Sequence, residues 1–208
     1  CAATVQAQNP TSGTAGPLKW QYNTGTKTLT ISNPSGTPED MPNFSDEDEQ
    51  PWKEVRGQIK KVAIEVGVSS IGDNAFTSCT RLDAVNFPAD GFTTIGYHAF
   101  NGCTALETIT IPASVTTIGD YAFSFSGLIQ IEVAADNTHF TAKDGVLYNK
   151  GQTILICYLP KKPGTDFTVP STVQTIDESA FQNCSALKTI TLPANLTTIG
   201  YDAFNSCT

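Results

Sequence analysis

The sequence is poor in charge, and the charge it has is mostly acidic. Charged residues make up 15% of the 208 residues, with 12 Lys and Arg against 20 Asp and Glu, which gives a net charge of −8. A nucleic-acid surface needs clustered Lys and Arg to meet the phosphates, and the sequence has no such cluster. We therefore expect no nucleic-acid partner.

Long apolar runs and catalytic motifs are also missing. No run of 18 apolar residues occurs, so we expect no membrane span in this chain. The two histidines, His98 and His139, are isolated, and the sequence contains no Cys-x-x-Cys, His-Glu-x-x-His, Gly-x-Ser-x-Gly or glycine-rich phosphate loop. We expect both histidines at the surface, and we expect no cofactor, no metal and no catalysis.

What the sequence has instead is a repeat marked by the dipeptide Ala-Phe. The dipeptide occurs at Ala75-Phe76, Ala99-Phe100, Ala122-Phe123, Ala180-Phe181 and Ala203-Phe204. The steps between the Phe residues are 24, 23, 58 and 23. A period near 23 is typical of leucine-rich solenoids, in which each coil buries its apolar residues against the next coil.

The frame around each Ala-Phe is I-G-x-x-A-F-x-x-C-x-x-L-x-x-I-x-I-P-x-x-V-x-x-I. The alternation of Ile109 and Ile111 predicts a short strand with one buried face, and Pro112 ends that strand. The Gly permits a bend, and the Ala and Phe fill the interior. We expect an α/β solenoid of right-handed leucine-rich repeats, with a parallel β-sheet of short strands and short helical or irregular return segments.

Four of the six cysteines share one position, three residues after the repeat Phe: Cys79, Cys103, Cys184 and Cys207. In the third unit Ser126 occupies this position. Stacked strands lie about 4.8 Å apart, which is compatible with a disulfide between neighbouring coils. Because Ser fits the same position and a free Cys packs as a small buried hydrophobe, we favour a ladder of free thiols.

An N-terminal cap precedes the repeats. In LKWQYNTGTKTLTIS, residues 18–32, apolar and polar residues alternate on both sides of Asn-Thr-Gly-Thr, which predicts a β-hairpin. Such a hairpin would cover the open apolar face of the first coil. We assign residues 18–57 to this β cap and to the acidic loop at residues 45–52, which we interpret as solvated.

The step of 58 residues contains an enlarged unit. Val146-Leu147-Tyr148 and Ile154-Leu155-Ile156 flank Asn149-Lys150-Gly151-Gln152, and this pattern predicts a second hairpin. We assign residues 58–208 to leucine-rich repeats, with the enlarged, hairpin-containing unit at about 134–170.

The first residues allow two interpretations. Cys1 would be the lipidated residue of a lipoprotein, or Val5-Gln6-Ala7 would be the cleavage site of a secretory signal. We favour signal cleavage near Ala7, because the Ala-Ala-Thr-Val after Cys1 is a poor hydrophilic tether. Residues 1–17 are then a signal-peptide remnant or a flexible tail, and either interpretation predicts a secreted or cell-surface protein.

The repeat frame, the N-terminal WxYN with TLTIS and PW, and the DGVLYNK hairpin together resemble the BspA-like family of leucine-rich repeat proteins. The resemblance extends from Leu18 to the end of the chain. Two departures from the pattern are Ser126 in place of Cys and Asp177 in place of Gly. The resemblance implies an exported or surface-attached bacterial protein, in a family whose members include adhesins for host matrix proteins or other cells.

Exposed positions on the predicted strands form the candidate binding face: Asp83, Asn86, Glu107, Thr108, Thr110, Gln130, Glu132, Lys188, Thr189 and Thr191. A second candidate surface consists of Tyr97, Tyr121 and Tyr201 near the bends; the alternative is that these tyrosine rings pack between turns. The strand face is rich in Thr and offers hydrogen bonds without a strong hot-spot cluster, which favours a broad surface over a deep small-molecule pocket.

We therefore expect a non-catalytic binding module or adhesin whose partner is an extracellular protein or glycan. The alternative is a repeat spacer that presents another domain. A glycan-active enzyme is a remote alternative, because Asp120, Glu178 and Asp202 recur on adjacent turns. The sequence stops where the frame calls for another strand, so we expect either further repeats or end-to-end self-association through this last repeat.

Overall fold

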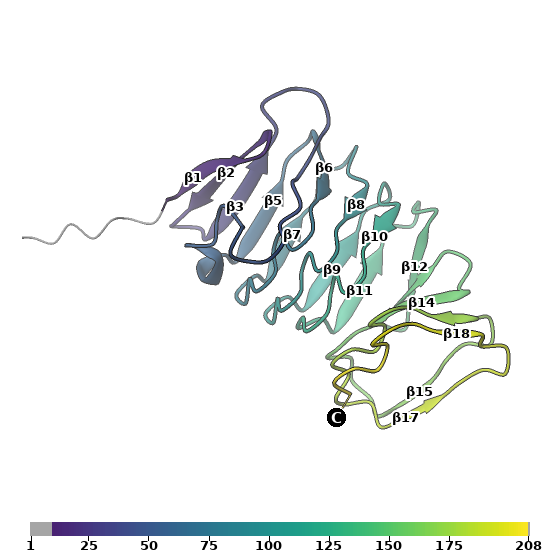
Figure 1. Ribbon diagram of the computed structural model, residues 1–208. Coiled ribbons are helices and arrows are strands. Elements are labelled where there is room, and N and C mark those ends of the chain that lie inside the picture. The colour runs from purple at the N-terminus through teal and green to yellow at the C-terminus, as the bar shows by residue number, and fades with distance from the viewer. Residues whose placement is uncertain (1–9, 208) are drawn as a thin grey trace, which may run out of the picture.

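The computed structural model describes residues 10–207 and shows a β-solenoid of short, mostly parallel strands (Figure 1). A single 3-10 turn, η1 (Arg56–Gln58), is the only helical element in this part of the chain. The predicted parallel solenoid is confirmed, whereas the α/β class is not, because the return segments contain no α-helix. The predicted sites at Cys1 and at Val5-Gln6-Ala7 lie outside the described residues.

One face of the solenoid consists of the cap strands and the Leu-x-x-Ile-x-Ile strands of the repeats. Its strands are β1 (Ser12–Ala15), β2 (Leu18–Asn23), β3 (Thr28–Ser32), β5 (Lys61–Ile64), β7 (Ala84–Asn86), β9 (Thr108–Ile111) and β11 (Gln130–Val133). They form a sheet in the order β1-β2-β3-β5-β7 and a second sheet of β9 and β11. From β3 onward the pairing is parallel, with Leu29 opposite Val62 and Ile109 opposite Ile131.

A further parallel sheet, which we did not predict from the sequence, forms another face of the coils. Its strands are β4 (Glu39–Asp40), β6 (Val68–Ile71), β8 (Thr94–Ile95) and β10 (Thr117–Ile118), in the order β10-β8-β6-β4. Strands of two residues are too short to show a period of two. The V-x-x-I part of the frame therefore carried no strand signal.

The N-terminal cap is a three-stranded antiparallel meander. β2 and β3 form the predicted hairpin, with Trp20 opposite Ile31, and Asn23 Oδ1 accepts hydrogen bonds from the backbone N–H groups of Gly25 and Thr26. Strand β1 pairs with the outer edge of β2. Residues 12–15, which we expected in a flexible tail, are therefore a strand, because they satisfy backbone groups that β2 would otherwise leave unpaired.

The return segments are irregular because each contains two residues in the left-handed conformation. His98 has φ 53° and Gly102 has φ 70°. The same two positions are left-handed in the other units: Asn74 and Ser78, Tyr121 and Phe125, Ser179 and Asn183, and Asp202 and Ser206. An α-helix needs φ near −63° at successive residues, so this pattern excludes a helical return.

The repeat aromatic residues stack in a column through the core, and we name each unit by its aromatic residue. Ring centroids lie 5.6 Å apart for Trp52 with Phe76 and for Phe76 with Phe100, and 6.1 Å apart for Phe100 with Phe123. Trp52, at the end of the acidic loop, is fully buried, and its Nε1 donates to the Ala75 carbonyl at 3.0 Å. The acidic loop is therefore solvated only in part, and its Pro-Trp pair takes the place of an Ala-Phe.

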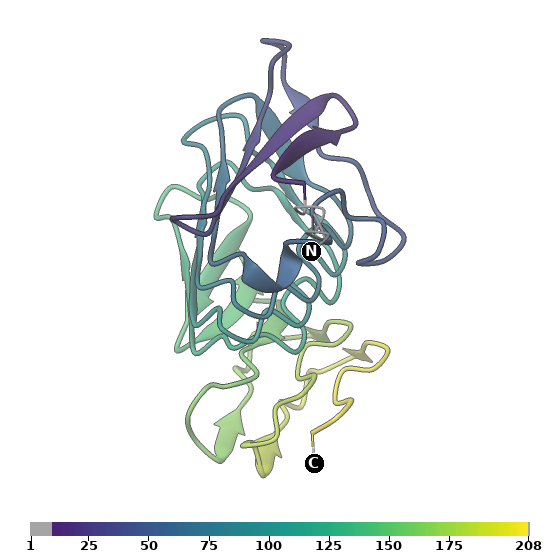
Figure 2. The ribbon, with the colours of Figure 1, turned by 90° about the vertical axis from the view of Figure 1, so that its left-hand side faces the viewer.

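The enlarged unit interrupts the solenoid. Its strands and those that follow are β12 (Phe140–Lys143), β13 (Val146–Asn149), β14 (Ile154–Tyr158), β15 (Asp166–Thr168), β16 (Thr175–Ile176), β17 (Thr189–Thr191) and β18 (Thr198–Ile199). They form one sheet in the order β12-β13-β14-β16-β18 and a pair of β15 with β17. The predicted hairpin is present as β13 and β14. Neither later sheet includes β10 or β11, and the coils after the hairpin are displaced from those before it (Figures 1 and 2).

Strand β13 separates two hydrophobic cores. Leu147 belongs to the core of the earlier coils, whereas Val146 and Tyr148 belong to the core of the later ones. Successive side chains of a strand point to opposite faces, so one strand serves both cores. We call residues 12–133 the N-terminal block and residues 154–207 the C-terminal block.

The interruption also breaks a hydrogen-bond ladder between return segments. Three backbone N–H groups of residues 98–102 donate to carbonyl groups of residues 120–124, at 2.8–3.2 Å. The equivalent N–H groups of Tyr121, Phe123 and Phe125 have no such partner among residues 10–207. The return of the Phe123 unit is therefore open toward the C-terminal block.

Glycine at the bend is required by the close approach of neighbouring coils. A Cβ on Gly96 would lie 2.6 Å from the carbonyl carbon of Gly72, and a Cβ on Gly119 would lie 2.5 Å from the backbone nitrogen of Tyr97. Asp177 occupies the same position of the Phe181 unit, and its backbone N–H donates to Leu155 of strand β14. Gly96 and Gly119 make the equivalent hydrogen bonds, to Ile71 and Ile95, but there the strand of the preceding coil ends and a bend follows. Strand β14 instead continues past Leu155 to Tyr158, so no bend lies against Asp177, which explains why this unit departs from Ile-Gly.

The cysteines form a ladder of free thiols, as predicted: Cys79, Cys103, Cys184 and Cys207, together with Cys157, are all unbridged. Cys103 Sγ donates to the Phe76 carbonyl at 3.2 Å, and Cys207 Sγ donates to the Phe181 carbonyl at 2.8 Å. Each of these thiols thus contacts the aromatic position of the preceding coil.

Candidate binding surfaces

All ten residues of the predicted binding face are exposed, but they lie on three separate sheets: that of β7, the pair of β9 and β11, and the pair of β15 and β17. Seven lie on or directly before β7, β9 and β11, and three lie on or directly before β17. Glu132 Oε1 accepts from Gln130 Nε2 at 2.8 Å, and Glu132 Oε2 accepts from Thr110 Oγ1 at 3.4 Å. The structure therefore brings the first seven together and leaves Lys188, Thr189 and Thr191 on another sheet, with the hairpin between.

At the second predicted surface, the His98 ring packs against the rings of Tyr97 and Tyr121. The ring centroids of Tyr97 and Tyr121 lie 5.6 Å apart, and the His98 ring lies 4.0 Å from Tyr97 and 5.0 Å from Tyr121. Tyr201 belongs to the C-terminal block and is 72% exposed. The three tyrosines therefore come from both sides of the interruption.

The prediction that His98 lies freely at the surface was wrong. His98 is half-buried against the two tyrosine rings, and this burial lowers its pKa, although the Asp73 carboxylate partly opposes the shift. Asn74, at the equivalent position, is buried because its Nδ2 donates to the Phe44 carbonyl in the cap at 2.8 Å. His139 is exposed, as predicted.

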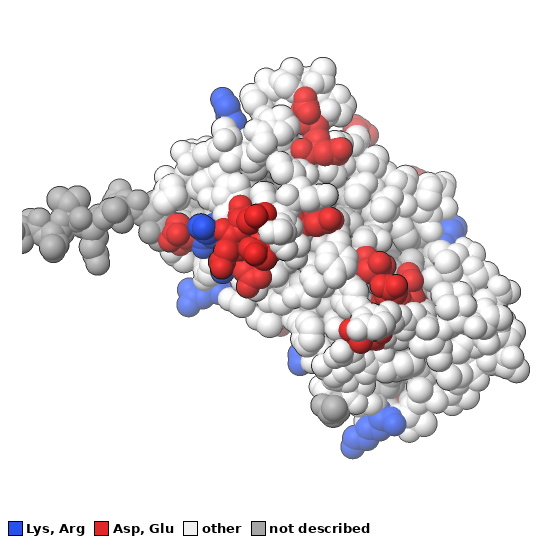
Figure 3. Space-filling view, in the orientation of Figure 1, with Lys and Arg blue, Asp and Glu red and all other residues white. Residues whose placement is uncertain are grey.

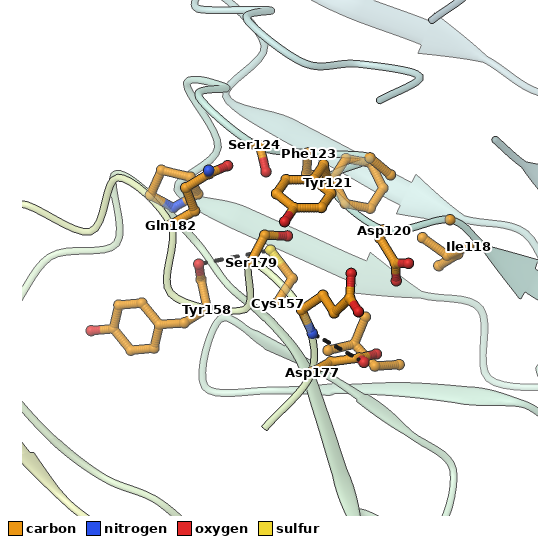
Figure 4. Close-up of a pocket in the computed structure, with 15 residues that line it drawn as sticks. Ile118, Asp120, Tyr121, Phe123, Ser124, Cys157, Tyr158, Asp177, Ser179 and Gln182 are labelled. Atoms are coloured by element: carbon orange, nitrogen blue, oxygen red, sulfur yellow. Dashed lines mark hydrogen bonds between the residues drawn. The ribbon is translucent and has the colours of Figure 1, made fainter. Parts of the chain in front are cut away.

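A cleft lies between the two blocks, and we call it the junction cleft (Figure 4). One wall is formed by residues 118–124 of the Phe123 unit. The opposite wall is formed by β14, Pro160 and the bend of the Phe181 unit, with Asp177, Glu178, Ser179 and Gln182. Its enclosed space is about 20 Å³, which is enough for one water molecule.

The mouth of the junction cleft is acidic. Asp120 and Glu178 are exposed and Asp177 is half-buried. Burial raises the pKa of Asp177, and the charges of Asp120 and Glu178 raise it further. Burial also raises the pKa of Tyr121, with added contributions from Asp202 and Glu178. Figure 3 shows a group of acidic side chains in the region of β10 on this face of the molecule.

These surfaces present hydroxyl groups, carboxylates and tyrosine rings. Within residues 10–207 no group of three or more His, Cys, Asp or Glu side chains is placed to hold a metal ion. Burial raises the pKa of Cys79 and Cys157 to about 12, so these thiols are protonated and poorly nucleophilic at neutral pH.

Sequence reasoning missed the junction cleft. Asp120 and Gln182 come from units on either side of the enlarged unit, and no local pattern predicts that they meet. One signal was present, since Asp177 replaces the Gly that a regular neighbouring bend would require.

None of the helices in residues 10–207 is long and apolar enough to cross a membrane.

Known proteins supply both a sequence match and structural matches. The sequence pattern of the BspA type leucine-rich repeat region matches residues 54–154 and 157–208, in six copies. A leucine-rich repeat protein from Eubacterium ventriosum is 31% identical, with a TM-score of 0.57, and the match covers 91% of this chain and 61% of that protein. The chain thus spans less than two thirds of that relative. No curated protein matches the chain.

More distant structures share the fold. The pneumococcal vaccine antigen PcpA is 18% identical, with a TM-score of 0.66, over 94% of this chain and 68% of that protein. The leucine-rich repeat protein of T. pallidum is 18% identical, with a TM-score of 0.50, over 90% of this chain and 85% of that protein. The repeat frame, the stacked coils and these matches agree: the chain belongs to the BspA-type leucine-rich repeat family.

Proposed function

We propose that this chain is an exported, non-catalytic binding module that acts as an adhesin for a protein or glycan on a host or neighbouring cell. The family supports a bacterial repeat scaffold. Export is part of the proposal because BspA-type leucine-rich repeat proteins are typically surface or secreted bacterial proteins.

The observation that carries the proposal is the exposed polar face of β7, β9 and β11. Strands β9 and β11 pair in register, so the backbone sets the spacing of their side chains at about 4.8 Å, and β7 lies beside β9. Glu132 is also held by Thr110 and Gln130. A surface of ordered donors and acceptors, without a deep pocket, suits an extended partner such as a protein segment or a glycan chain. Lys188, Thr189 and Thr191 would then form a separate contact area on β17.

The test is retention on an array of extracellular-matrix proteins and glycans. The double variant T110A/E132A removes an ordered pair from the face, and we expect it to weaken binding at least tenfold. The matched control D136A/T138A likewise removes one Thr and one carboxylate, here an Asp, from exposed positions outside the strands of the face. Binding that is unchanged in T110A/E132A would refute the strand face as the site. A wild-type chain with no saturable ligand would favour the spacer.

A further inference from the structure

The junction cleft contains a buried acceptor without a donor. Gln182 is 7% exposed and lines the cleft, yet its amide Oε1 has no hydrogen-bond partner in the described part of the chain. Buried amide oxygens normally accept at least one hydrogen bond. Figure 4 shows Gln182 on the wall opposite Ser124. This unused acceptor indicates a ligand, or a bound water, that donates.

The same cleft has carboxylates without a counter-ion. No Lys or Arg is among the residues that line it, and within residues 10–207 the one ion pair joins Arg56 to Asp48 in the acidic loop. Lys162 lies over the Tyr158 ring, 5.3 Å from its centroid, and pairs with none of the cleft carboxylates. Asp120 and Glu178 therefore hold negative charge at the mouth that nothing described neutralises.

Tyrosine rings flank these carboxylates. Tyr121 lines the cleft, with the Tyr97 ring 5.6 Å away, and the negative charges of Asp202 and Glu178 act on its hydroxyl. The face of a tyrosine ring attracts a cation, and this attraction increases where water is partly excluded. Carboxylates, an amide oxygen and an aromatic face all favour a positively charged donor.

The separation of the oxygen atoms and the nearby tyrosine ring favour a guanidinium over a metal ion or an ammonium group. The described carboxylates do not converge as the ligands of a metal ion do. A guanidinium has five N–H donors in one plane and no acceptor, so it reaches several separated oxygens at once and stacks on an aromatic ring. An ammonium is a compact point charge and spans such a site less well.

We propose that the mouth of the junction cleft binds an arginine side chain of a basic partner protein, with the guanidinium over Tyr121, between Asp120 and Glu178, and one N–H linked to Gln182 Oε1 through the single water that the enclosed space admits. This inference rests on the proposed function only in taking the chain to be a binding module. It uses a different surface from the strand face, so the two proposals can fail separately.

The test uses the full chain and a fluorescent hexa-arginine peptide, followed by anisotropy at 50 and 300 mM NaCl. We expect saturable 1:1 binding that salt weakens, with hexa-lysine several-fold weaker and hexa-serine inactive. The variant D120N/E178Q should weaken hexa-arginine binding at least tenfold. The control D90N/D136N removes the same charge from exposed positions elsewhere and should change binding less than twofold.

The variant Q182M separates binding from folding. Methionine has a similar length and no acceptor, so removing an unsatisfied buried oxygen should leave the Tm unchanged or raise it. Hexa-arginine binding should nevertheless weaken three- to tenfold. T110A/E132A should bind hexa-arginine within twofold of wild type, and this would leave the test of the strand face independent.

Three outcomes would overturn the proposal. The first is no saturable binding of hexa-arginine at 50 mM NaCl. The second is an equal loss in D120N/E178Q and D90N/D136N, which would show general attraction to an acidic protein. The third is saturable Ca²⁺ binding that D120N/E178Q abolishes, which would make the site a metal site.

Discussion

The two blocks contain the same repeat, but their aromatic columns begin differently. In the N-terminal block the column begins at Trp52, against which Trp20 and Phe44 pack edge-on, 6.4 and 5.7 Å away. In the C-terminal block it begins at Tyr158, which stacks 5.2 Å from Phe181. Both starting residues are larger or more polar than the repeat Phe. The difference shows that the repeat sets the spacing of the coils, whereas a local cap decides where a column starts.

The largest effect should come from truncating one aromatic residue in each column. Phe100 and Phe181 are fully buried, so F100A and F181A should each lower the free energy of unfolding by about 3–5 kcal/mol. Both tryptophans lie in the N-terminal block. Urea unfolding followed by tryptophan fluorescence should shift strongly for F100A and little for F181A, while circular dichroism should report both. Coincident shifts by the two probes in F181A would show that the blocks unfold as one unit.

A smaller effect should distinguish the bends of the two blocks. G119A places a Cβ 2.5 Å from the backbone of Tyr97 and should destabilise by about 1–3 kcal/mol. D177A, at the same position of the C-terminal block, already has a Cβ there and should change stability much less. G57A, where a Cβ meets nothing within 4 Å, is the control for a general Gly effect. Equal losses in G119A and D177A, measured by urea unfolding, would contradict this explanation of the Asp.

Hydrogen exchange should detect the broken ladder. The amide protons of Tyr121, Phe123 and Phe125 have no carbonyl partner in the described chain, whereas the equivalent amide protons of residues 98–102 do. We expect the three unpaired amides to exchange at least tenfold faster, as measured by NMR. Equal protection at both returns would mean that the blocks close on each other in solution.

The smallest effect should come from the titration of Asp177. Burial raises its pKa above the ordinary 3.8, so the unfolded chain loses this proton first as the pH rises. Stability should therefore fall as the pH rises from about 3.8 through the raised pKa and stay lowered above it. D177N cannot ionise and should have a higher Tm than wild type at pH 7, with the difference lost at pH 3. A constant difference across this range would exclude ionisation as the cause.

Much of the fold could be predicted from the sequence because the strands that carry it alternate. The cap hairpin and the hairpin of β13 and β14 followed from period-two patterns. The units of Trp52 and Tyr158 did not, because Pro-Trp and Cys-Tyr do not match Ala-Phe. Their spacing was a usable signal, since Trp52 lies 24 residues before Phe76 and Tyr158 lies 23 before Phe181.

The candidate binding sites, too, could be predicted only where a local alternation of residues encodes them. The exposure of Thr108 and Thr110 followed from alternation with buried Ile109. The half-burial of His98 depended on rings that only the folded coil brings to it. The junction cleft depended on how two blocks sit across a hairpin, which no pattern within one unit encodes.

The hairpin of β13 and β14, which separates the two cores, also fixes how the two candidate binding surfaces are oriented relative to each other. Because β13 packs into both blocks, the face of β9 and β11 and the mouth of the junction cleft are held at a set angle, without a linker between them. A flexible ligand would lose more conformational freedom than a rigid one on contacting both surfaces at once. If both proposed surfaces bind, a rigid ligand whose two contact points match that angle would engage both together, and the hairpin would then favour partners of that shape.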